Sequence, residues 1–322
     1  MVYDVITVGS ATVDAFTNTG KKLFKRGKKD CVQVPFGSKI LIEQLKFDIG
    51  GGGTNTAVAL SKLGLKTSYI GSMGCGNNSQ RIKTLLKKEK VDCSFIQSCN
   101  GRTGFSVILD AEGHDRTILV FKGNNDNLEF NQINKSKLKT KWFYFSAMLN
   151  KSLKTQIKLA EYAKKHQIKI AYNPSCYLAK KGTKLIKPIL EKTTLLVLNR
   201  EEAEYLVNGK NINQILKKLQ KLGPEIAIVT EGHKPTYAID KEYIYKIQPD
   251  NIKVLEATGA GDAFASSVLA GLIKKHNLEF ALKLGLANSQ SVITYYGAKN
   301  KLLTYKEAIK KAKNKKVKKV KL

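Results

Sequence analysis

Short apolar runs that alternate with helical patterns constrain the fold of this chain most. The runs lie at residues 142–145, 168–172, 195–198 and 226–229. Between them, residues 153–166 and 212–222 repeat apolar side chains at helical spacing. Nearly continuous apolar runs are typical of strands buried on both faces, and helices supply the crossovers that parallel strands need. We predict an α/β fold with a doubly wound, mostly parallel sheet flanked by helices.

Two stretches do not follow this alternation. Residues 32–47 and 104–121 both have the character of extended segments, and the second contains two strand-like runs around a turn at residues 111–114. We expect this second stretch to form a β-hairpin. With 322 residues and 42% hydrophobic content, the chain can bury one sizeable core, so we expect a single domain over residues 1–322.

The run Thr-Gly-Ala-Gly-Asp at residues 258–262 carries the clearest chemical signal. Gly259, Ala260 and Gly261 let backbone amides approach an anion, and the helix predicted to follow adds the positive end of its dipole. Asp262 supplies a carboxylate that can accept a proton from an attacking alcohol. This combination suits phosphoryl transfer to a hydroxyl. A glycine-rich turn capped by an aspartate is the alternative interpretation.

A second cluster, Asp-Ile-Gly-Gly-Gly-Gly-Thr-Asn, occupies residues 48–55 and precedes a helical pattern at residues 56–63. Four consecutive glycines are expected where the backbone comes very close to something bound. Asp14 follows a first predicted strand at residues 5–8. Ligands bind at the carboxyl ends of such strands, and a carboxylate can accept hydrogen bonds from two sugar hydroxyls. Alternatively, Asp14 is a loop residue that turns the chain.

These two clusters together resemble the two signatures of the ribokinase-like carbohydrate kinases, the PfkB family. The first is the glycine run that ends at Asn55, and the second is the segment at residues 257–264. Their order and separation also match, and the resemblance extends from residue 5 to about residue 303. It implies a ribokinase-like fold and an ATP-dependent transfer of the γ-phosphoryl group to a sugar hydroxyl.

The resemblance also implies roles for individual residues. Asp262 corresponds to the general base, and Gly259, Ala260 and Gly261 correspond to the anion hole. The positions that hold the sugar hydroxyls are Asp14, Gly51, Gly52 and Asn55. The positions that hold the nucleotide are Asn199, Glu202, Thr230, Gly232 and Asn288. Glu202 is also expected to organise Mg²⁺, largely through water, which fits the reluctance of this ion to lose its hydration shell.

Glu202 has a second interpretation. Glu201, Glu202 and Glu204 could be acidic residues near a helix start that stabilise the helix through its dipole, with no ligand.

In relatives, the extended stretches form a β lid over the sugar site, and the resemblance implies such a lid from residues 15–48 and 104–122. Closure of the lid would expel water from the reactive phosphate. The lid is the dimer contact in some relatives, so a homodimer through the lid is one expectation. The sequence itself leaves the oligomeric state open.

The chain departs from the family pattern near the site where ribokinase holds a monovalent cation. Glu256 stands where relatives usually carry Asp, and Lys301 occupies a position that is often Ser. A fixed ammonium would repel a potassium ion at close range, which argues against activation by potassium. Pro235 replaces a frequent glycine after the nucleotide turn.

The formal net charge of +30 raises the alternative of a polyanion-binding protein. Eight lysines lie in residues 310–321, within the lysine-rich tail of residues 310–322, which we expect to be a helix end or a frayed extension. No aromatic interleaving or nucleic-acid motif accompanies these lysines. We therefore do not expect nucleic acid to be the partner, although the positive field would attract ATP.

The five cysteines are an odd number without Cys-x-x-Cys spacing, so neither a zinc site nor a disulfide framework is indicated. Residues 1–4 lead straight into a predicted strand without a signal peptide, and no apolar run has the length of a membrane span. We expect a cytoplasmic enzyme with no membrane partner.

Two alternatives to a sugar kinase remain within the same resemblance. A nucleoside kinase would use the same scaffold to phosphorylate a riboside. A sugar-binding regulator would keep the fold without the chemistry, although the intact Asp262 argues against it.

Overall fold

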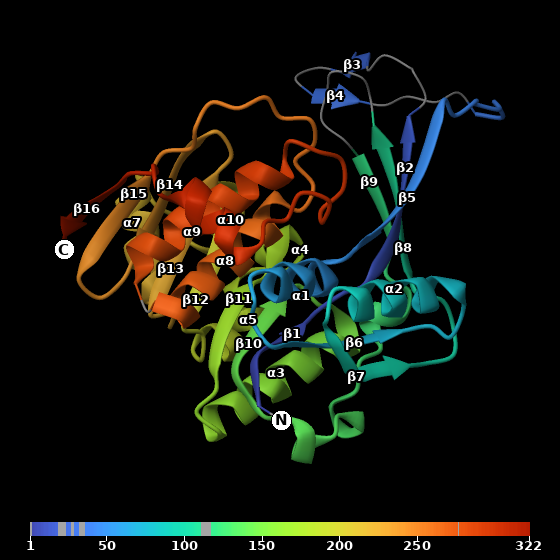
Figure 1. Cartoon of the computed structure of the whole chain (residues 1–322), viewed down its shortest axis with the longest axis horizontal. Helices are drawn as coiled ribbons and strands as arrows, with labels where there is room; N and C mark the ends of the chain where they lie inside the picture. Colours follow the sequence, from blue (N-terminus) through green and yellow to red (C-terminus); the bar gives the residue numbers. More distant parts are fainter. Residues whose placement is uncertain (1, 19–23, 27–28, 32–35, 111–116, 276) are drawn as a thin grey trace.

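A ten-stranded sheet runs through the centre of the protein (Figure 1). The computed structural model describes residues 2–18, 24–26, 29–31, 36–110, 117–275 and 277–322. In spatial order the strands are β16 (Val317–Lys321), β15 (Tyr243–Ile247), β14 (Lys234–Ile239), β13 (Ile226–Glu231), β12 (Leu195–Asn199), β11 (Lys169–Asn173), β10 (Thr140–Ser146), β1 (Tyr3–Val8), β6 (Thr67–Met73) and β7 (Asp92–Ser98). The strands from β7 to β13 pair in parallel, whereas β14, β15 and β16 pair antiparallel. The predicted mostly parallel sheet is confirmed.

The central strands are buried on both faces. All seven residues of β6 are buried, and six of the seven residues of β10 are buried. Both strands are rich in aromatic or β-branched residues, which pack well on a pleated surface that helices cover. This double burial is why the strands in the sequence are nearly continuous apolar runs.

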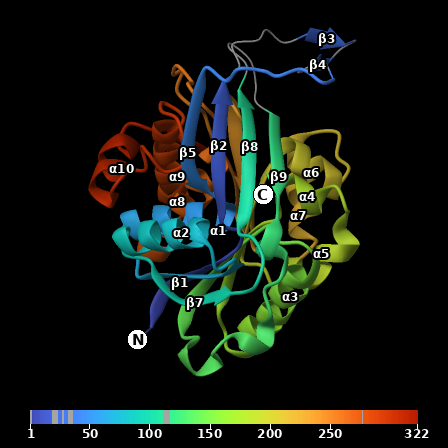
Figure 2. The same ribbon diagram turned by 90° about the vertical axis from the view of Figure 1, so that its right-hand side faces the viewer.

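Helices cover the sheet in two layers, which Figure 2 shows on either side of the strands. One layer contains α1 (Gly52–Lys62), α2 (Asn77–Lys88), α8 (Ala260–Lys275), α9 (Leu278–Val292) and α10 (Tyr305–Ala312). The other contains α3 (Asn150–Lys165), α4 (Ser175–Ala179), α5 (Thr183–Leu190), α6 (Arg200–Leu206) and α7 (Ile212–Gln220). Residues 263–272 of α8 are all buried, because α8 packs against both α1 and α9. The start of α8 is therefore held rigidly.

A second, smaller sheet projects from the main body, as Figures 1 and 2 show. Its strands are β5 (Gln44–Gly50), β2 (Thr12–Asn18), β8 (Gly104–Asp110) and β9 (Thr117–Phe121). β8 and β9 pair antiparallel, which confirms the predicted hairpin, although its turn at residues 111–114 lies outside the described residues. In the other extended stretch, residues 32–35 are also outside the described residues, and β5 begins only at Gln44.

The lysine-rich tail begins as the end of α10, as expected, but its remainder is not a frayed extension. After α10 the chain forms β16, which pairs antiparallel with β15 along all five of its residues at the edge of the main sheet. Lys315, just before β16, donates hydrogen bonds to Asp250 and Gln290, both at 2.5 Å. Lysines on an edge strand discourage pairing with the edge of another sheet, because their charges would have to be buried.

A two-stranded hairpin, β3 (Phe24–Arg26) and β4 (Lys29–Cys31), lies near the tip of the smaller sheet (Figure 1). In the described part of the chain, no helix is long and apolar enough to cross a membrane. Cys75, Cys93, Cys99 and Cys176 are free thiols.

Candidate active site

The order of the strands creates a switch point between β1 and β10. From β1 the chain proceeds to β6 and β7 on one side, and later returns to β10 on the other side. In open α/β sheets, ligands bind at the carboxyl ends of the strands beside such a point. A cavity of about 390 Å³ lies there, with Ser10 after β1, and Ser146 and Ala147 at the end of β10, in its wall. The fold therefore provides a binding site beside two adjacent parallel strands whose connections run in opposite directions.

The start of α8 forms another part of this wall. Gly259, Gly261 and Asp262 all line the cavity. Gly259 has φ +79°, a conformation that glycine adopts without strain. Of the three predicted anion-hole amides, that of Ala260 is the least available, because it already donates to the carbonyl of Ala257 at 3.2 Å. The Gly259 and Gly261 amides thus remain the better candidates to bind an anion at this helix start.

Asp262 lies in the first turn of α8 and is partly buried. Its Oδ2 accepts a hydrogen bond of 2.8 Å from Nδ2 of Asn55, on α1. Burial raises the pKa of the Asp262 carboxyl, whereas this hydrogen bond and the charge of Lys299 lower it. A partly desolvated carboxylate that faces a cavity is suited to act as a general base.

The glycine run turns the chain from β5 into α1. Gly51 has φ +94°, and a Cβ there would lie 2.4 Å from the carbonyl oxygen of Ser10. A Cβ on Gly53 would lie 2.6 Å from the carbonyl carbon of Gly9. Gly51 and Gly53 are thus required for contact with the protein's own backbone. Gly52 is the one glycine of this run in the cavity wall, as the residues that line it show.

Asp14 lies on β2, in the smaller sheet, and not in a loop that turns the chain after β1. It is 8% exposed, its Oδ1 accepts a 2.8 Å hydrogen bond from the hydroxyl of Thr12, and burial raises its pKa. Among the described residues that line the 390 Å³ cavity, neither Asp14, Gly51 nor Asn55 occurs. Asn55 still reaches the site through Asp262.

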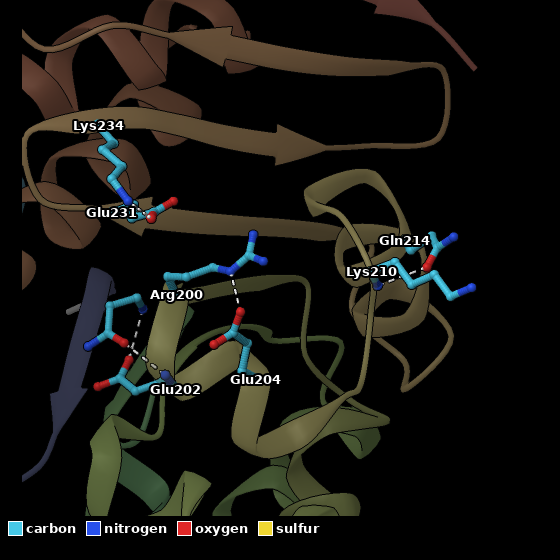
Figure 3. Close-up of polar contacts among 8 residues, drawn as sticks. Arg200, Glu202, Glu204, Lys210, Gln214, Glu231 and Lys234 are labelled. Carbon is cyan, nitrogen blue, oxygen red and sulfur yellow. Dashed lines mark hydrogen bonds and ion pairs between the residues drawn. The ribbon is translucent and has the colours of Figure 1, made fainter.

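Asn199 and Glu202 form a capping box at the start of α6. The side chain of Asn199 accepts from the amide of Glu202 at 2.8 Å, and Glu202 Oε2 accepts from the amide of Asn199 at 2.9 Å. Figure 3 shows these bonds, together with the surface pair of Arg200 and Glu204 on the same helix. Glu201 and Glu202 thus lie in the first turn of α6, as the helix-start interpretation expects.

Glu202 nevertheless contributes to the cavity. It is 7% exposed and lines the cavity together with Asp262, and burial raises its pKa. Among the residues that the structure describes, no group of three His, Cys, Asp or Glu side chains could hold a metal ion. The two carboxylates in the cavity wall, Glu202 and Asp262, fit Mg²⁺, which is usually bound through one or two carboxylates, waters and substrate phosphates.

A second cavity, of about 500 Å³, lies on the other side of the α8 start. Thr230 and Gly232 line it, at the turn from β13 to β14, and Gly261 lines both cavities. Apolar residues such as Phe264 and Leu286 form much of its surface. A phosphate chain that passes Gly261 can therefore extend from an apolar pocket to Asp262.

Asn288 lies next to this second cavity but is not part of its wall. It is fully buried, its Nδ2 donates to Ser267 at 2.7 Å, and its Oδ1 accepts from the amide of Leu303 at 2.9 Å. The neighbouring residues Ser289 and Gln290 of α9 line the cavity instead. The amide of Asn288 thus bonds to the protein, and α9 faces the cavity through other side chains.

Lys122 and Ser146 are among the residues of the first cavity that the sequence analysis did not find. Lys122 follows β9, its ammonium lies 4.2 Å from the centre of the Tyr177 ring, and burial lowers its pKa. Ser146, at the end of β10, has a buried hydroxyl without a hydrogen-bond partner in the described structure. Only the position of Lys122 directly after the predicted hairpin could have distinguished it among many lysines.

The comparisons with known proteins agree with this geometry. A family model described as pfkB family carbohydrate kinase matches residues 4–304. The chain belongs to this family. It is 28% identical over 250 residues to an uncharacterized sugar kinase of Archaeoglobus fulgidus. This match covers 76% of this chain and 98% of the relative.

Solved structures of pfkB-type kinases share the fold. The Arabidopsis thaliana ribokinase complexed with ribose and ATP has a TM-score of 0.81 at 19% identity, over 97% of this chain and 99% of that chain. The nucleoside kinase of Methanocaldococcus jannaschii has a TM-score of 0.80 at 21% identity, with the same two coverages. The ribokinase-like fold is thereby confirmed. As a pfkB family member, this chain is a carbohydrate kinase that phosphorylates a hydroxyl.

The structure also locates the residues that depart from the pfkB pattern. Lys301 is exposed, with its ammonium 5.4 Å from the centre of the Tyr295 ring. Glu256 accepts a hydrogen bond of 2.7 Å from the amide of Gly297. The buried lysine of this segment is Lys299, which is 6% exposed.

Proposed function

We propose that this kinase transfers the γ-phosphoryl group of ATP to a sugar hydroxyl, with Asp262 as the general base. One observation carries the proposal. The Asp262 carboxylate and Gly261 lie in the wall of one cavity, and Gly261 also lines the apolar pocket suited to a nucleobase. An acceptor in the first cavity and ATP in the second would meet at the start of α8.

In this reaction the acceptor oxygen forms a bond to the γ-phosphorus while the bond from that phosphorus to the β–γ bridging oxygen breaks. Asp262 takes the proton of the hydroxyl, and ADP leaves with the electron pair of the broken bond. The amides of Gly259 and Gly261 would donate hydrogen bonds to the transferring group, where negative charge develops. Lys122 adds a positive charge to the same cavity.

Glu202 would hold Mg²⁺, through water, beside the phosphates of ATP. The chemical contribution of Mg²⁺ is to neutralise phosphate charge during the transfer. Glu202 has one oxygen in the capping box, so its carboxylate is held in place beside the cavity. The nucleotide itself would be held by the turn at Thr230 and Gly232.

We place the acceptor sugar at the mouth of the first cavity, with its reacting hydroxyl inside the cavity beside Asp262 and its other hydroxyls toward Asp14 on the smaller sheet, which would act as the lid. Asp14 is the candidate to accept hydrogen bonds from two sugar hydroxyls. Replacing Asp14 with Asn is expected to raise KM for the acceptor at least about tenfold, because one charge-assisted acceptor becomes a donor. The KM for ATP should change less than about twofold. Steady-state kinetics with each substrate varied would test this, and an unchanged acceptor KM would contradict the role of Asp14.

The smaller sheet also carries apolar side chains on its surface. Leu45, Phe47, Leu119 and Phe121 are 45–56% exposed. We propose that this face forms a homodimer contact. Sedimentation velocity is expected to give twice the chain mass, and Leu119→Asp is expected to shift the protein to the monomer. A wild-type protein that sediments as a monomer at micromolar concentration would contradict the contact.

A screen of acceptors tests the proposed function and identifies the substrate. ADP release would be measured with ribose, fructose, fructose phosphates, inosine, adenosine and cytidine. Activity with a sugar supports the proposal, and activity with a riboside alone would make the chain a nucleoside kinase, the activity that the Methanocaldococcus jannaschii structure is named for. Tight sugar binding without ADP release would favour a regulator.

A further inference from the structure

Lys299 places an ammonium in the interior beside the candidate active site. It lies in the segment after α9 and is 6% exposed. Its Nζ donates a hydrogen bond of 2.5 Å to the carbonyl oxygen of Ile49, at the end of β5, and another to Oδ1 of Asn55. The ammonium thus joins the chain around residue 299 to both ends of the glycine run.

This contact determines which way the Asn55 amide points. An ammonium has three donors and no acceptor, so it can bond only to the oxygen of the amide. With Oδ1 of Asn55 held by Lys299, Nδ2 faces Asp262 and donates to its Oδ2 at 2.8 Å. The flipped amide would place N–H groups against an ammonium and an oxygen against a carboxylate. Both contacts would be repulsive, so Lys299 excludes that orientation.

The orientation of Asn55 in turn leaves one Asp262 oxygen for chemistry. Oδ2 is used by Asn55, and Oδ1 lies on the side of Gly52, where a Cβ would be 3.7 Å from it. Gly52 lines the cavity. A carboxylate fixed through one oxygen presents the other in a constant position, which a general base requires.

We propose that Lys299 is a positioning residue for the reaction: it fixes the Asn55 amide, and its charge helps to keep Asp262 ionised. The inference rests on the proposed role of Asp262. Lys299 itself lines neither of the two cavities. Its effect passes through one hydrogen-bonded chain from the ammonium to Asn55 and from Asn55 to the carboxylate.

The charges around Lys299 support this role. Four carboxylates from different elements act on it: Asp48 of β5, Asp14 of β2, Asp262 of α8, and Glu89 after α2. Burial lowers the pKa of Lys299 to about 8, and these carboxylates oppose the lowering. Below pH 8 the ammonium is charged and lowers the pKa of Asp262. Above pH 8 that charge is lost, so the chain of contacts weakens as the pH rises.

The test compares Lys299→Met, Lys299→Arg and a matched control, Lys306→Met. Methionine keeps the length and the apolar stem of lysine but has no hydrogen-bond donor and no charge. Arginine keeps the donors and the positive charge. Lys306 is an exposed lysine of α10. For Lys299→Met we expect kcat to fall at least about tenfold, with KM for ATP within about twofold of wild type. Lys299→Arg should recover part of kcat, and Lys306→Met should leave kcat unchanged.

The pH profile separates positioning from a merely structural role. In Lys299→Met the acidic limb of kcat/KM should move to higher pH, because the pKa of Asp262 rises without the nearby positive charge. In wild type, deprotonation of Lys299 should reduce activity near pH 8. In Lys299→Met this reduction should be absent. A fall in thermal stability with kcat and both limbs unchanged would overturn the proposal.

A direct measurement keeps this inference independent of kinase activity. Carbon-13 NMR of labelled aspartate carboxyls, assigned with Asp262→Asn, gives the pKa of Asp262 in wild type and in Lys299→Met. We expect it to rise by about one pH unit in the variant. If no acceptor is phosphorylated but the pKa still rises, the proposed function fails and the Lys299 contact stands. An unchanged pKa would overturn the inference whatever the activity.

Discussion

Replacing Asp262 with Asn is expected to lower kcat by about 10²–10⁴-fold, the usual loss when a general base is removed. The fold should survive this change. The oxygen of the new amide can still accept the 2.8 Å hydrogen bond that Asn55 Nδ2 donates to Asp262. The other end of the amide cannot take a proton from the acceptor. Steady-state kinetics at saturating ATP and acceptor would measure the loss.

Nucleotide binding provides the control for this variant. Asp262 lines the cavity assigned to the acceptor and does not occur among the described residues that line the 500 Å³ pocket. The Kd for ATP, measured by calorimetry, should therefore stay within about threefold of wild type. Ordinary turnover in Asp262→Asn would show that another group takes the proton.

Replacing Gly259 with Ala is expected to cause the second largest effect. The residue has φ +79°, and a Cβ would lie 2.4 Å from Cβ and 2.7 Å from Cα of Ala298. Backbone strain and overlap with rigid atoms together are expected to lower the free energy of unfolding by about 2–4 kcal/mol. Displacing the amide that we propose as a donor to the phosphate should also lower kcat about 10²-fold.

Gly261→Ala is the matched control for stability. It changes the same residue type two positions away, but no heavy atom lies within 4 Å of the added Cβ. Its thermal unfolding should stay close to wild type, although its kcat can change because Gly261 lines both cavities. Equal unfolding temperatures for Gly259→Ala and wild type would contradict the account of the turn before α8.

The sequence predicted the parallel core of the fold because buried strands leave a strong pattern. The runs in β10 through β13 are apolar on both faces, and helices separate most of them. The strand β16 was missed for the opposite reason. Its sequence, Val-Lys-Lys-Val-Lys, has the composition of a solvated tail, and only pairing with β15 makes it a strand.

The site could be predicted where its chemistry is local in sequence. The start of α8 combines Gly259, Gly261 and Asp262 within four residues, so the role that we propose for them could be predicted from the sequence alone. Lys299 could not be found in this way, because it is 244 residues from Asn55 along the chain. Nothing local distinguishes it from the many surface lysines. Only its burial and its contact with Asn55 reveal its role.

Two sets of residues that the sequence analysis assigned to ligand binding make contacts within the protein instead. The glycine run was expected to approach a ligand, yet Gly51 and Gly53 approach Ser10 and Gly9 of the same chain. The amide of Asn288 bonds to Ser267 and Leu303 inside the protein. In both places, packing accounts for a residue type that ligand binding would also favour, and a sequence pattern cannot separate the two.

A crystal structure with the identified acceptor and a non-hydrolysable ATP analogue would test the central claim most directly. We predict that one acceptor hydroxyl lies within about 3.2 Å of an Asp262 carboxylate oxygen, in line with the terminal phosphorus. The amides of Gly259 and Gly261 should face the oxygens of that phosphate. A bound acceptor whose hydroxyl faces a different base, with Asp262 turned away from it, would contradict the mechanism.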